Sequence, residues 1–229
     1  KDLSAHIGED VLIKGWVSVR RDQGKMIFFD FRDMSGTVQG VVLPASEAME
    51  AAKETRNEYV VAVEGMVNKR PERNVQAGKQ NGDIELEVKK LEIVSVAQDL
   101  PFELESEVNL DTLLDHRPFT LRRQRERAIF TVQSEIIRSY REFLTQEDFK
   151  EFQAPKLVGD DAEGGCNIFR VEYFKDKDAF LATSPQLYKQ IMVGVFERVF
   201  AIGNVFRAEK HATTRHLNEY TSMDIEMGF

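Results

Sequence analysis

The first 98 residues repeat one pattern, in which a short stretch rich in valine, isoleucine and phenylalanine is followed by a polar turn. Five such stretches are predicted to be β-strands, because β-branched and aromatic residues favour extended backbone. Between the third and the fourth lies Ala45–Thr55, whose alanine, glutamate, lysine and methionine residues favour a helix. The five predicted strands are Val11–Arg20, Met26–Arg32, Thr37–Leu43, Tyr59–Lys69 and Ile84–Val94.

Five strands with a helix after the third is the expected order of an OB-fold, a small barrel that frequently binds single-stranded nucleic acid. Residues 1–98 are therefore predicted to form this barrel. Alternation along the second strand predicts that Phe29 and Phe31 lie in the core and Phe28 on the surface. The alternative is that all three rings are core. Basic residues available for phosphate contacts nearby are Arg21, Lys25 and Arg32.

Composition narrows the class of protein. The 229 residues are 42% hydrophobic and 31% charged, which suits two domains with buried cores. No apolar run approaches the ~20 residues that span a bilayer, and the polar start Lys1-Asp2 does not suit a signal peptide. The single cysteine, Cys166, suits a reducing cytosol, so a cytoplasmic location is expected. The net charge of −8 argues against general affinity for nucleic acid, although basic residues gathered on one surface can still bind RNA.

Residues 99–116 are predicted to be a linker between two domains. They contain six acidic residues and no lysine or arginine, so the segment is expected to be solvated and extended. Five arginines follow between Arg117 and Arg127. They fit either the charged start of a helix or contact with an RNA backbone.

Residues 117–229 are predicted to form a mixed α+β domain built on an antiparallel sheet. A helix is expected over Gln124–Gln146, because apolar residues from Ile129 to Leu144 recur at steps of three and four. The other predicted elements are a strand at Phe149–Pro155, strands at Ile168–Phe174 and Ala179–Thr183, a helix at Ser184–Phe196, and an antiparallel strand pair at Arg198–Phe206 and Tyr220–Phe229.

The loop between the last two strands carries a pattern that fits a polyphosphate nucleotide. Arg207 and Glu209 are expected to point the same way, because residues two apart on a strand share a face. A guanidinium can bind a phosphate bidentately, and a carboxylate can accept a hydrogen bond from the exocyclic amine of a base. Arg215 and His216 add donors, and Tyr220 offers a ring for stacking. The alternative for the Arg-x-Glu pair alone is a solvated strand face.

This pattern resembles the second signature motif of the class II aminoacyl-tRNA synthetases, an FRxE strand, a loop and an RHxxEF strand. The helix followed by a proline-ended strand resembles the first motif, which forms the dimer interface in that family. Glu163-Gly164-Gly165 looks like the mobile loop of the aspartyl enzymes of this family, and SPQLYK at Ser184–Lys189 resembles their SPQxxK motif. The resemblance is to subclass b and to the archaeal or eukaryotic-like type. The family's third motif does not occur, so the chain looks like roughly the N-terminal half of such an enzyme.

The resemblance implies an aspartate–tRNA ligase that uses ATP and Mg²⁺, acts on tRNA and forms a homodimer, with the fragment alone expected to be inactive. Arg207 would be the catalytic residue, acting on the α-phosphate. The metal-binding acidic residues would lie downstream of this sequence. ATP would be held by Arg207, Glu209, Arg215, His216, Leu217 and Tyr220, and aspartate by Glu163, Ser184, Gln186, Lys189 and Arg207. The tRNA anticodon would contact Arg21, Phe28, Arg32 and Gln39.

Two other functions stay open from the sequence. One is a non-catalytic tRNA- or RNA-binding protein that keeps the barrel and a vestigial synthetase domain, which the missing third motif supports. The other is an asparaginyl or lysyl enzyme of the same subclass. Lys189 disfavours the asparaginyl enzyme, because in the aspartyl family the lysine at this place pairs with the β-carboxylate of the substrate and the asparaginyl relatives do not keep it.

Overall fold

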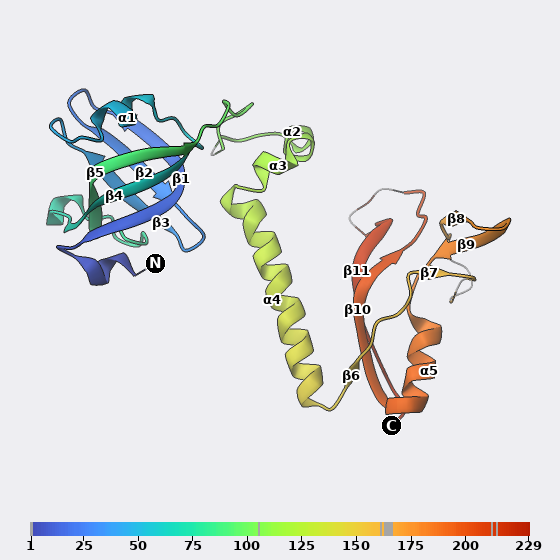
Figure 1. Cartoon of the computed structure of the whole chain (residues 1–229). Helices are drawn as coiled ribbons and strands as arrows, with labels where there is room; N and C mark the ends of the chain where they lie inside the picture. The colour runs from blue at the N-terminus through green and yellow to red at the C-terminus, as the bar shows by residue number, and fades with distance from the viewer. Residues whose placement is uncertain (1, 105, 161, 163–166, 212, 214) are drawn as a thin grey trace. The chain divides into compact units, whose positions relative to one another are not determined.

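The computed structural model describes residues 2–104, 106–160, 162, 167–211, 213 and 215–229. The chain divides into two compact units, Lys1–Ser106 and Glu107–Phe229 (Figure 1). The division falls inside the predicted linker. Among the described residues, no helix is both long enough and apolar enough to cross a membrane.

The first unit is a closed five-stranded barrel with the strand order β1-β2-β3-β5-β4, which confirms the predicted OB-fold. Neighbouring strands are antiparallel except for β3 and β5, which pair in parallel. The strands are β1 (Asp10–Asp22), β2 (Ile27–Arg32), β3 (Thr37–Val42), β4 (Val60–Lys69) and β5 (Ile84–Ser95), with the 3-10 helices η1 (Leu3–His6) and η2 (Glu72–Asn74).

The helix after the third strand is shorter than predicted. It is α1 (Met49–Glu54), and residues 45–48 form a turn instead. Ser46 explains the difference, because its hydroxyl donates to the carbonyl of Val88 at 2.7 Å and accepts from the amide of Ala48 at 3.2 Å. A serine that bonds to nearby backbone competes with the helix, so the local propensity of this segment is overridden at its start.

The barrel core is built from alternate residues of its strands. Phe29 and Phe31 are buried and their rings stack with centroids 5.3 Å apart, as the alternation of β2 predicted. Phe28 is half-buried on the opposite face of the same strand. The core cluster also includes buried residues from all the other strands, among them Val17, Val42, Val63 and Leu86.

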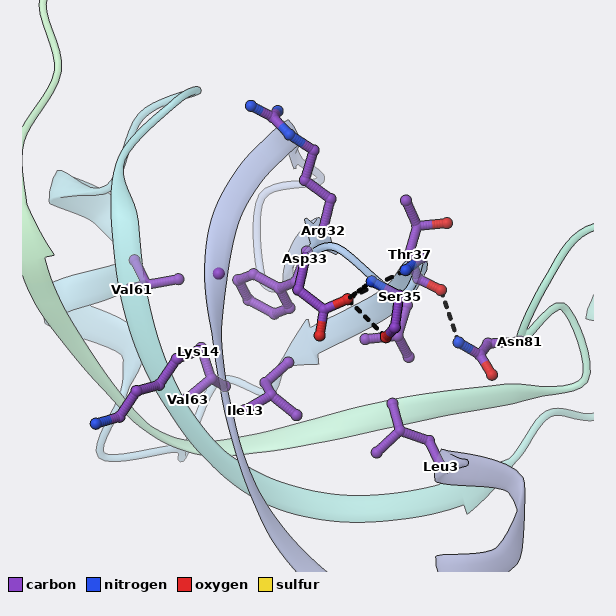
Figure 2. A pocket seen from close by; sticks show the side chains of 14 residues that line it. Leu3, Ile13, Lys14, Arg32, Asp33, Ser35, Thr37, Val61, Val63 and Asn81 are labelled. Atoms are coloured by element: carbon purple, nitrogen blue, oxygen red, sulfur yellow. Dashed lines mark hydrogen bonds between the residues drawn. The ribbon is translucent and has the colours of Figure 1, made fainter. Parts of the chain in front are cut away.

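The turn between β2 and β3 lines a pocket of the barrel (Figure 2). The Asp33 carboxylate accepts hydrogen bonds from the amide and hydroxyl of Ser35, both at 2.7 Å, and from the amide of Gly36 at 3.1 Å. The hydroxyl of Ser35, more than any other group, lowers the pKa of Asp33 below its ordinary value. The side chain of Asn81, from the loop before β5, donates to the carbonyl of Thr37 at 2.8 Å and ties that loop to β3.

The linker contains a helix, so the expectation that it is extended is wrong for residues 110–115. The side chain of Asn109 accepts a hydrogen bond from the amide of Thr112 at 2.8 Å and caps α2 (Leu110–Asp115). Asp111 lies in the first turn, where an acidic group is favourable. The acidic residues of this segment therefore indicate solvation, and the asparagine cap decides the local backbone. The short helix α3 (Arg117–Thr120) follows.

The second unit contains two small sheets and two longer helices, in agreement with the predicted mixed domain. One sheet has the order β11-β10-β6 and the other β7-β9-β8. Figure 1 shows α5 lying beside β10 and β11. The elements are α4 (Gln124–Gln146), β6 (Lys150–Glu151), β7 (Leu157–Val158), β8 (Arg170–Tyr173), β9 (Lys177–Leu181), α5 (Gln186–Phe196), β10 (Arg198–Phe206) and β11 (Glu219–Met227).

The apolar stripe predicted on α4 is mostly exposed. The helix has the predicted bounds, and Leu144 at its end is buried with Phe149 and Phe200. In contrast, Ile129, Val132, Ile136 and Phe143 are each at least half exposed. A groove beside this stripe is lined by α4 and by Thr221 and Met223 of β11.

Candidate functional sites

Lys189 lies at the centre of a charged cluster in the second unit. It is buried on α5, and its Nζ is 3.3 Å from Oδ1 of Asp224 and 3.6 Å from Oε2 of Glu226. The two carboxylates lie on the same face of β11, because alternation leaves its even-numbered residues half-buried and its odd-numbered residues exposed. The spacing of two between Asp224 and Glu226 was visible in the sequence, whereas their pairing with Lys189 was not predicted.

Asp224 is also close to groups from two other segments. Burial lowers the pKa of Lys156, and the charge of Asp224 opposes that shift. Burial raises the pKa of Tyr140, and Asp224 raises it further. The hydroxyl of Ser222 donates to Asp224 Oδ2. No sequence motif marked Lys156, and it reaches this place because it follows the loop after β6.

The start of α5 holds two more of the predicted aspartate-binding residues. The helix begins at Gln186, two residues later than predicted, and Pro185 occupies the N-cap position. The hydroxyl of Ser184 accepts a hydrogen bond from the amide of Gln186 at 3.1 Å. Ser184 and Gln186 are therefore placed on the same segment as Lys189. Glu163, Gly164, Gly165 and Cys166 lie outside the described residues.

Arg207 lies near Tyr220, another of the predicted ATP-binding residues. Its guanidinium carbon lies 6.0 Å from the centroid of the Tyr220 ring, in a cation–π arrangement. The expectation that Arg207 and Glu209 share a strand face is wrong, because β10 ends at Phe206. The amide of Ala208 donates to the carbonyl of Asn167 at 2.8 Å, and the amide of Glu209 donates to the carbonyl of Arg207 at 2.7 Å. The chain therefore turns away from the strand direction at this point.

The remaining predicted ATP-binding residues lie in the loop between β10 and β11. Arg215, His216 and Leu217 are exposed. His216 Nδ1 is 2.7 Å from the hydroxyl of Thr213, and the same hydroxyl accepts from the amide of Arg215 at 3.2 Å. The loop therefore has its own short hydrogen-bonded turn, which presents a guanidinium and an imidazole to solvent.

The predicted RNA-binding residues share one face of the barrel. Strand register places Arg21 of β1 opposite Phe28 of β2, and Asp30, two residues along β2, opposite Gln39 of β3. Arg32, two residues further, faces the same way. We call Arg21, Phe28, Asp30, Arg32 and Gln39 the outer face of the barrel. The structure therefore brings together all four residues that the sequence assigned to this role.

Each arginine of the outer face is paired with a carboxylate that the sequence did not assign to the site. Arg21 donates from Nη1 and Nη2 to the two oxygens of Asp30 at 2.9 and 2.8 Å, and these bonds raise the pKa of Arg21. Arg32 makes the same kind of pair with Glu58, at 2.7 and 2.8 Å. Alternation along β2 could have indicated Asp30. Glu58 lies 26 residues from Arg32, and no local pattern links them.

Each of the two units matches a family of known proteins. Residues 11–94, which include all five strands of the barrel, match the family model "OB-fold nucleic acid binding domain". Residues 109–229 match the family model "tRNA synthetases class II (D, K and N)". The chain belongs to this family of class II tRNA synthetases.

Relatives with this architecture are named as ligases for aspartate. The aspartate–tRNA(Asp/Asn) ligase of Thermus thermophilus is 44% identical, over 100% of this chain and 52% of its own length. That of Archaeoglobus fulgidus is also 44% identical, over 97% of this chain and 51% of its own length. The chain therefore spans about half the length of the curated relatives it matches.

Solved structures of both aspartyl and asparaginyl enzymes are similar to this chain. The asparaginyl-tRNA synthetase of Pyrococcus horikoshii, complexed with asparaginyl-adenylate, has a TM-score of 0.86 and 33% identity, covering 97% of this chain and 50% of its own. The aspartyl-tRNA synthetase of Entamoeba histolytica has a TM-score of 0.80 and 30% identity, covering 98% of this chain and 48% of its own.

Proposed function

We propose that the chain is part of an aspartate–tRNA ligase, which activates aspartate with ATP and transfers it to tRNA. The observation that carries this proposal is that Lys189, one of the predicted aspartate-binding residues, is buried beside two carboxylates. A buried ammonium must be paired, and here it can exchange one of its carboxylate partners for the β-carboxylate of aspartate. Asparagine, whose side chain is neutral, offers no such exchange.

The other aspartate contacts follow from the elements around Lys189. We propose that Gln186 and Ser184 bind the substrate from the start of α5, that Glu163 binds its ammonium group, and that Arg207 binds its α-carboxylate. Supporting this, Ser184 and Gln186 precede Lys189 in one continuous segment.

For ATP, we propose that Arg207 binds the α-phosphate, Glu209 the amine of adenine, and Arg215 with His216 the γ-phosphate, with Leu217 beside the nucleotide. Tyr220 would stack on the base through one face of its ring, and the guanidinium carbon of Arg207 already lies 6.0 Å from the centroid of that ring. A bidentate guanidinium–phosphate pair is a strong charge-assisted interaction. The position of the half-buried Arg207 beside Tyr220, directly after β10, supports this proposal.

The proposed reaction needs no nucleophilic side chain. A carboxylate oxygen of aspartate attacks the α-phosphorus of ATP in line and pyrophosphate leaves; the 3′-terminal hydroxyl of tRNA then attacks the acyl carbon and AMP leaves. Arg207 stabilises the charge that develops on the α-phosphate. Mg²⁺ supplies neutralisation of phosphate charge when bound. Within the part of the chain that the structure describes, no group of three or more His, Cys, Asp or Glu side chains could hold a metal ion.

We propose that residues 1–98 bind the tRNA anticodon through the outer face, that 99–116 are the hinge and that 117–229 belong to the catalytic domain. Phe28 would stack on the central base, a contact worth about 1–3 kcal/mol, with Gln39 and Arg21 at its edge. Arg32 is already neutralised by Glu58 and lies 5.7 Å from the ring of Trp16. We therefore propose that Arg32 contacts the RNA as a hydrogen-bond donor and not as an unpaired charge.

We also propose that the ligase is a cytoplasmic homodimer and that α4 lies in the dimer interface. Exposed apolar side chains on α4 and on the odd-numbered face of β11 support this, among them Ile129, Val132, Met223 and Ile225. Contiguous apolar surface is a common sign of an interface. Light scattering should give twice the chain mass, and Ile129→Glu should shift it toward the monomer; a monomeric wild type would contradict the proposal.

Substrate choice tests the proposed function in a full-length ligase that carries this chain. Lys189→Ala should raise the KM for aspartate and abolish the preference over asparagine, since a desolvated carboxylate that loses its partner costs about 3–5 kcal/mol. Arg207→Ala should instead depress kcat/KM for both amino acids, because its proposed target is the transition-state phosphate. Pyrophosphate exchange with each amino acid measures both effects.

Two outcomes would oppose the proposal, and a third would oppose a separate expectation about the 229-residue chain. A Lys189→Ala enzyme that still rejects asparagine would place selectivity elsewhere, and a full-length protein with no exchange would favour the non-catalytic RNA-binding function. We expect the 229-residue chain alone to show no useful exchange, because the third motif of the family does not occur in it. Exchange by this chain at a rate typical of a synthetase would refute that expectation.

A further inference from the structure

Asp30 occupies the middle of the outer face, and the proposed function gives it no role. Asp30 lies on β2, two residues after Phe28, and is opposite Gln39 of β3. Its two carboxylate oxygens each accept a hydrogen bond from Arg21. A carboxylate at the centre of a face that receives a polyanion requires an explanation, because by itself it would repel phosphate.

The pair orders Arg21 before any ligand arrives. Two of the five N–H donors of the guanidinium are used by Asp30, which fixes the plane of the group and leaves the other three donors available. Arg21 lies opposite Phe28 in the strand register. Its guanidinium binds Asp30, which lies opposite Gln39 of β3. Polar groups from three strands therefore meet beside the Phe28 ring.

The two arginine pairs of the outer face differ in their access to a ligand. The side chain of Glu58 is only 3% exposed, so the Arg32 pair is held within the protein. In the other pair, the side chains of Arg21 and Asp30 are 41% and 32% exposed. Arg21 is therefore the more accessible of the two arginines, and it can meet RNA while its carboxylate partner stays in place.

We propose that Asp30 is a positioning residue that makes Arg21 recognise the edge of a base stacked on Phe28 instead of binding a phosphate. The inference rests on the proposed RNA-binding function of the barrel. Asp30 offsets the charge of Arg21 locally, which weakens its attraction to phosphate, while the free N–H donors keep one orientation. Such donors match a pyrimidine that presents a carbonyl oxygen, as uracil does at position 4, and they oppose cytosine, which presents an amine donor there.

The test uses the 229-residue chain and two hairpin RNAs that differ only in uridine or cytidine at the centre of the loop. The wild type should bind the uridine hairpin more tightly. Asp30→Asn should lower the uridine-over-cytidine affinity ratio about tenfold, since a bidentate contact carries discrimination of that order. It should also steepen the slope of log affinity against log salt by about 0.7, because the released Arg21 then pairs with a phosphate.

Two further variants make the test specific. Arg21→Lys keeps the charge but cannot form the bidentate pair, so it should lose the ratio to a similar extent. Asp10→Asn is the matched control, because Asp10 pairs with Lys89 at 2.7 Å elsewhere on the barrel and the substitution makes the same charge change. It should leave both the ratio and the salt slope unchanged.

The outcomes separate this inference from the function on which it rests. A wild-type chain that binds both hairpins equally would refute the proposed recognition by the outer face, and the role of Asp30 with it. A selective wild type with an Asp30→Asn variant of unchanged ratio and slope would overturn the role of Asp30 alone. If circular dichroism shows that Asp30→Asn unfolds the barrel, Arg21→Lys decides, and a wild-type ratio in that variant overturns the inference.

Discussion

The barrel and the second unit satisfy their apolar residues in different ways. Every barrel strand has two neighbours in a closed sheet, and residues such as Phe29 and Val63 are completely buried inside it. In the second unit the sheet β11-β10-β6 is open, and Ile225 of β11 and Ile136 of α4 are each about half exposed. In the barrel, strands that are close in sequence bury one another's apolar side chains. In the second unit, the elements are further apart in sequence and leave part of their apolar surface exposed.

The charged groups follow the same division. On the barrel, Arg21 and Asp30 lie on neighbouring strands nine residues apart. In the second unit, Lys189 reaches Asp224 across 35 residues, from a helix to a strand. The site in the second unit therefore depends on tertiary packing to a greater degree, and four predictions test how far this difference extends.

The largest expected effect is on the barrel core. Phe29→Ala should lower the free energy of unfolding of the barrel by about 3–5 kcal/mol, because the ring is fully buried and no neighbour can fill its place without moving. Urea unfolding followed by the fluorescence of Trp16, the single tryptophan, measures this unit. Ile136→Ala on α4 is the control, and at a concentration where the chain is monomeric it should change stability by no more than about 0.5 kcal/mol, measured by circular dichroism. Equal costs at that concentration would show that Ile136 is packed within the single chain.

The second substitution concerns the buried cluster. Lys189→Met should destabilise the second unit by about 3 kcal/mol, because Asp224 and Glu226 would lose the cation between them. Hydrogen exchange of the amides of β10 and β11 measures the local free energy of opening. Lys177→Met removes an exposed lysine from β9 and should leave exchange unchanged. Equal protection in both variants would mean that the cluster does not hold α5 against the sheet.

The third prediction compares how closely atoms surround one glycine of each unit, Gly65 of the barrel and Gly203 of the second unit. A Cβ at Gly65 would lie 2.4 Å from the carbonyl oxygen of Glu87, a backbone atom that cannot move without shifting a strand. A Cβ at Gly203 would lie 3.1 Å from the end of the flexible Lys156 side chain. Gly65→Ala should therefore cost about 1–3 kcal/mol and Gly203→Ala less than about 1. Urea unfolding of both variants measures the difference, and the reverse order would contradict the steric argument.

The smallest expected effect is on the turn between β2 and β3. Asp33→Ala should cost about 1 kcal/mol, the net value of a few solvated hydrogen bonds. The folded pKa of Asp33 is lowered, so its contribution is present above its ordinary pKa of 3.8 and is lost as pH falls through the folded value. Barrel stability should therefore fall less steeply in acid for the variant than for the wild type. Parallel acid profiles would show that Asp33 contributes nothing through its charge.

Much of the fold followed from local pattern. The barrel strands were predicted to within two residues, and α4 and β10 have the predicted bounds. Errors occurred where a short polar side chain bonds to the backbone, as Ser46 does before α1 and Asn109 does before α2. Such a hydrogen bond contributes about as much free energy as the helix propensities of several residues together. A prediction from composition therefore misses its effect.

The candidate sites divide in a similar way. Alternation on β2 predicted that Phe28 lies outside the core, and the family resemblance assigned Gln39 to the same role. In the structure both lie on one face. The same reasoning failed for Glu209, because the strand ends before it. The partners of Lys189 and Arg32 could not be predicted, since Asp224 and Glu58 are separated from them by long stretches of chain.

The sequence by itself determined the two units, most of their elements and the chemical types gathered in each site, because periodicity and residue type act over a few neighbouring positions. The tertiary structure decided which charges are paired. Lys189 meets Asp224 only because α5 packs on the face of β11 that holds its even-numbered residues, and Arg32 meets Glu58 only because the barrel closes. An ion pair needs atoms within a few ångströms, and only the folded chain brings such distant residues to that distance.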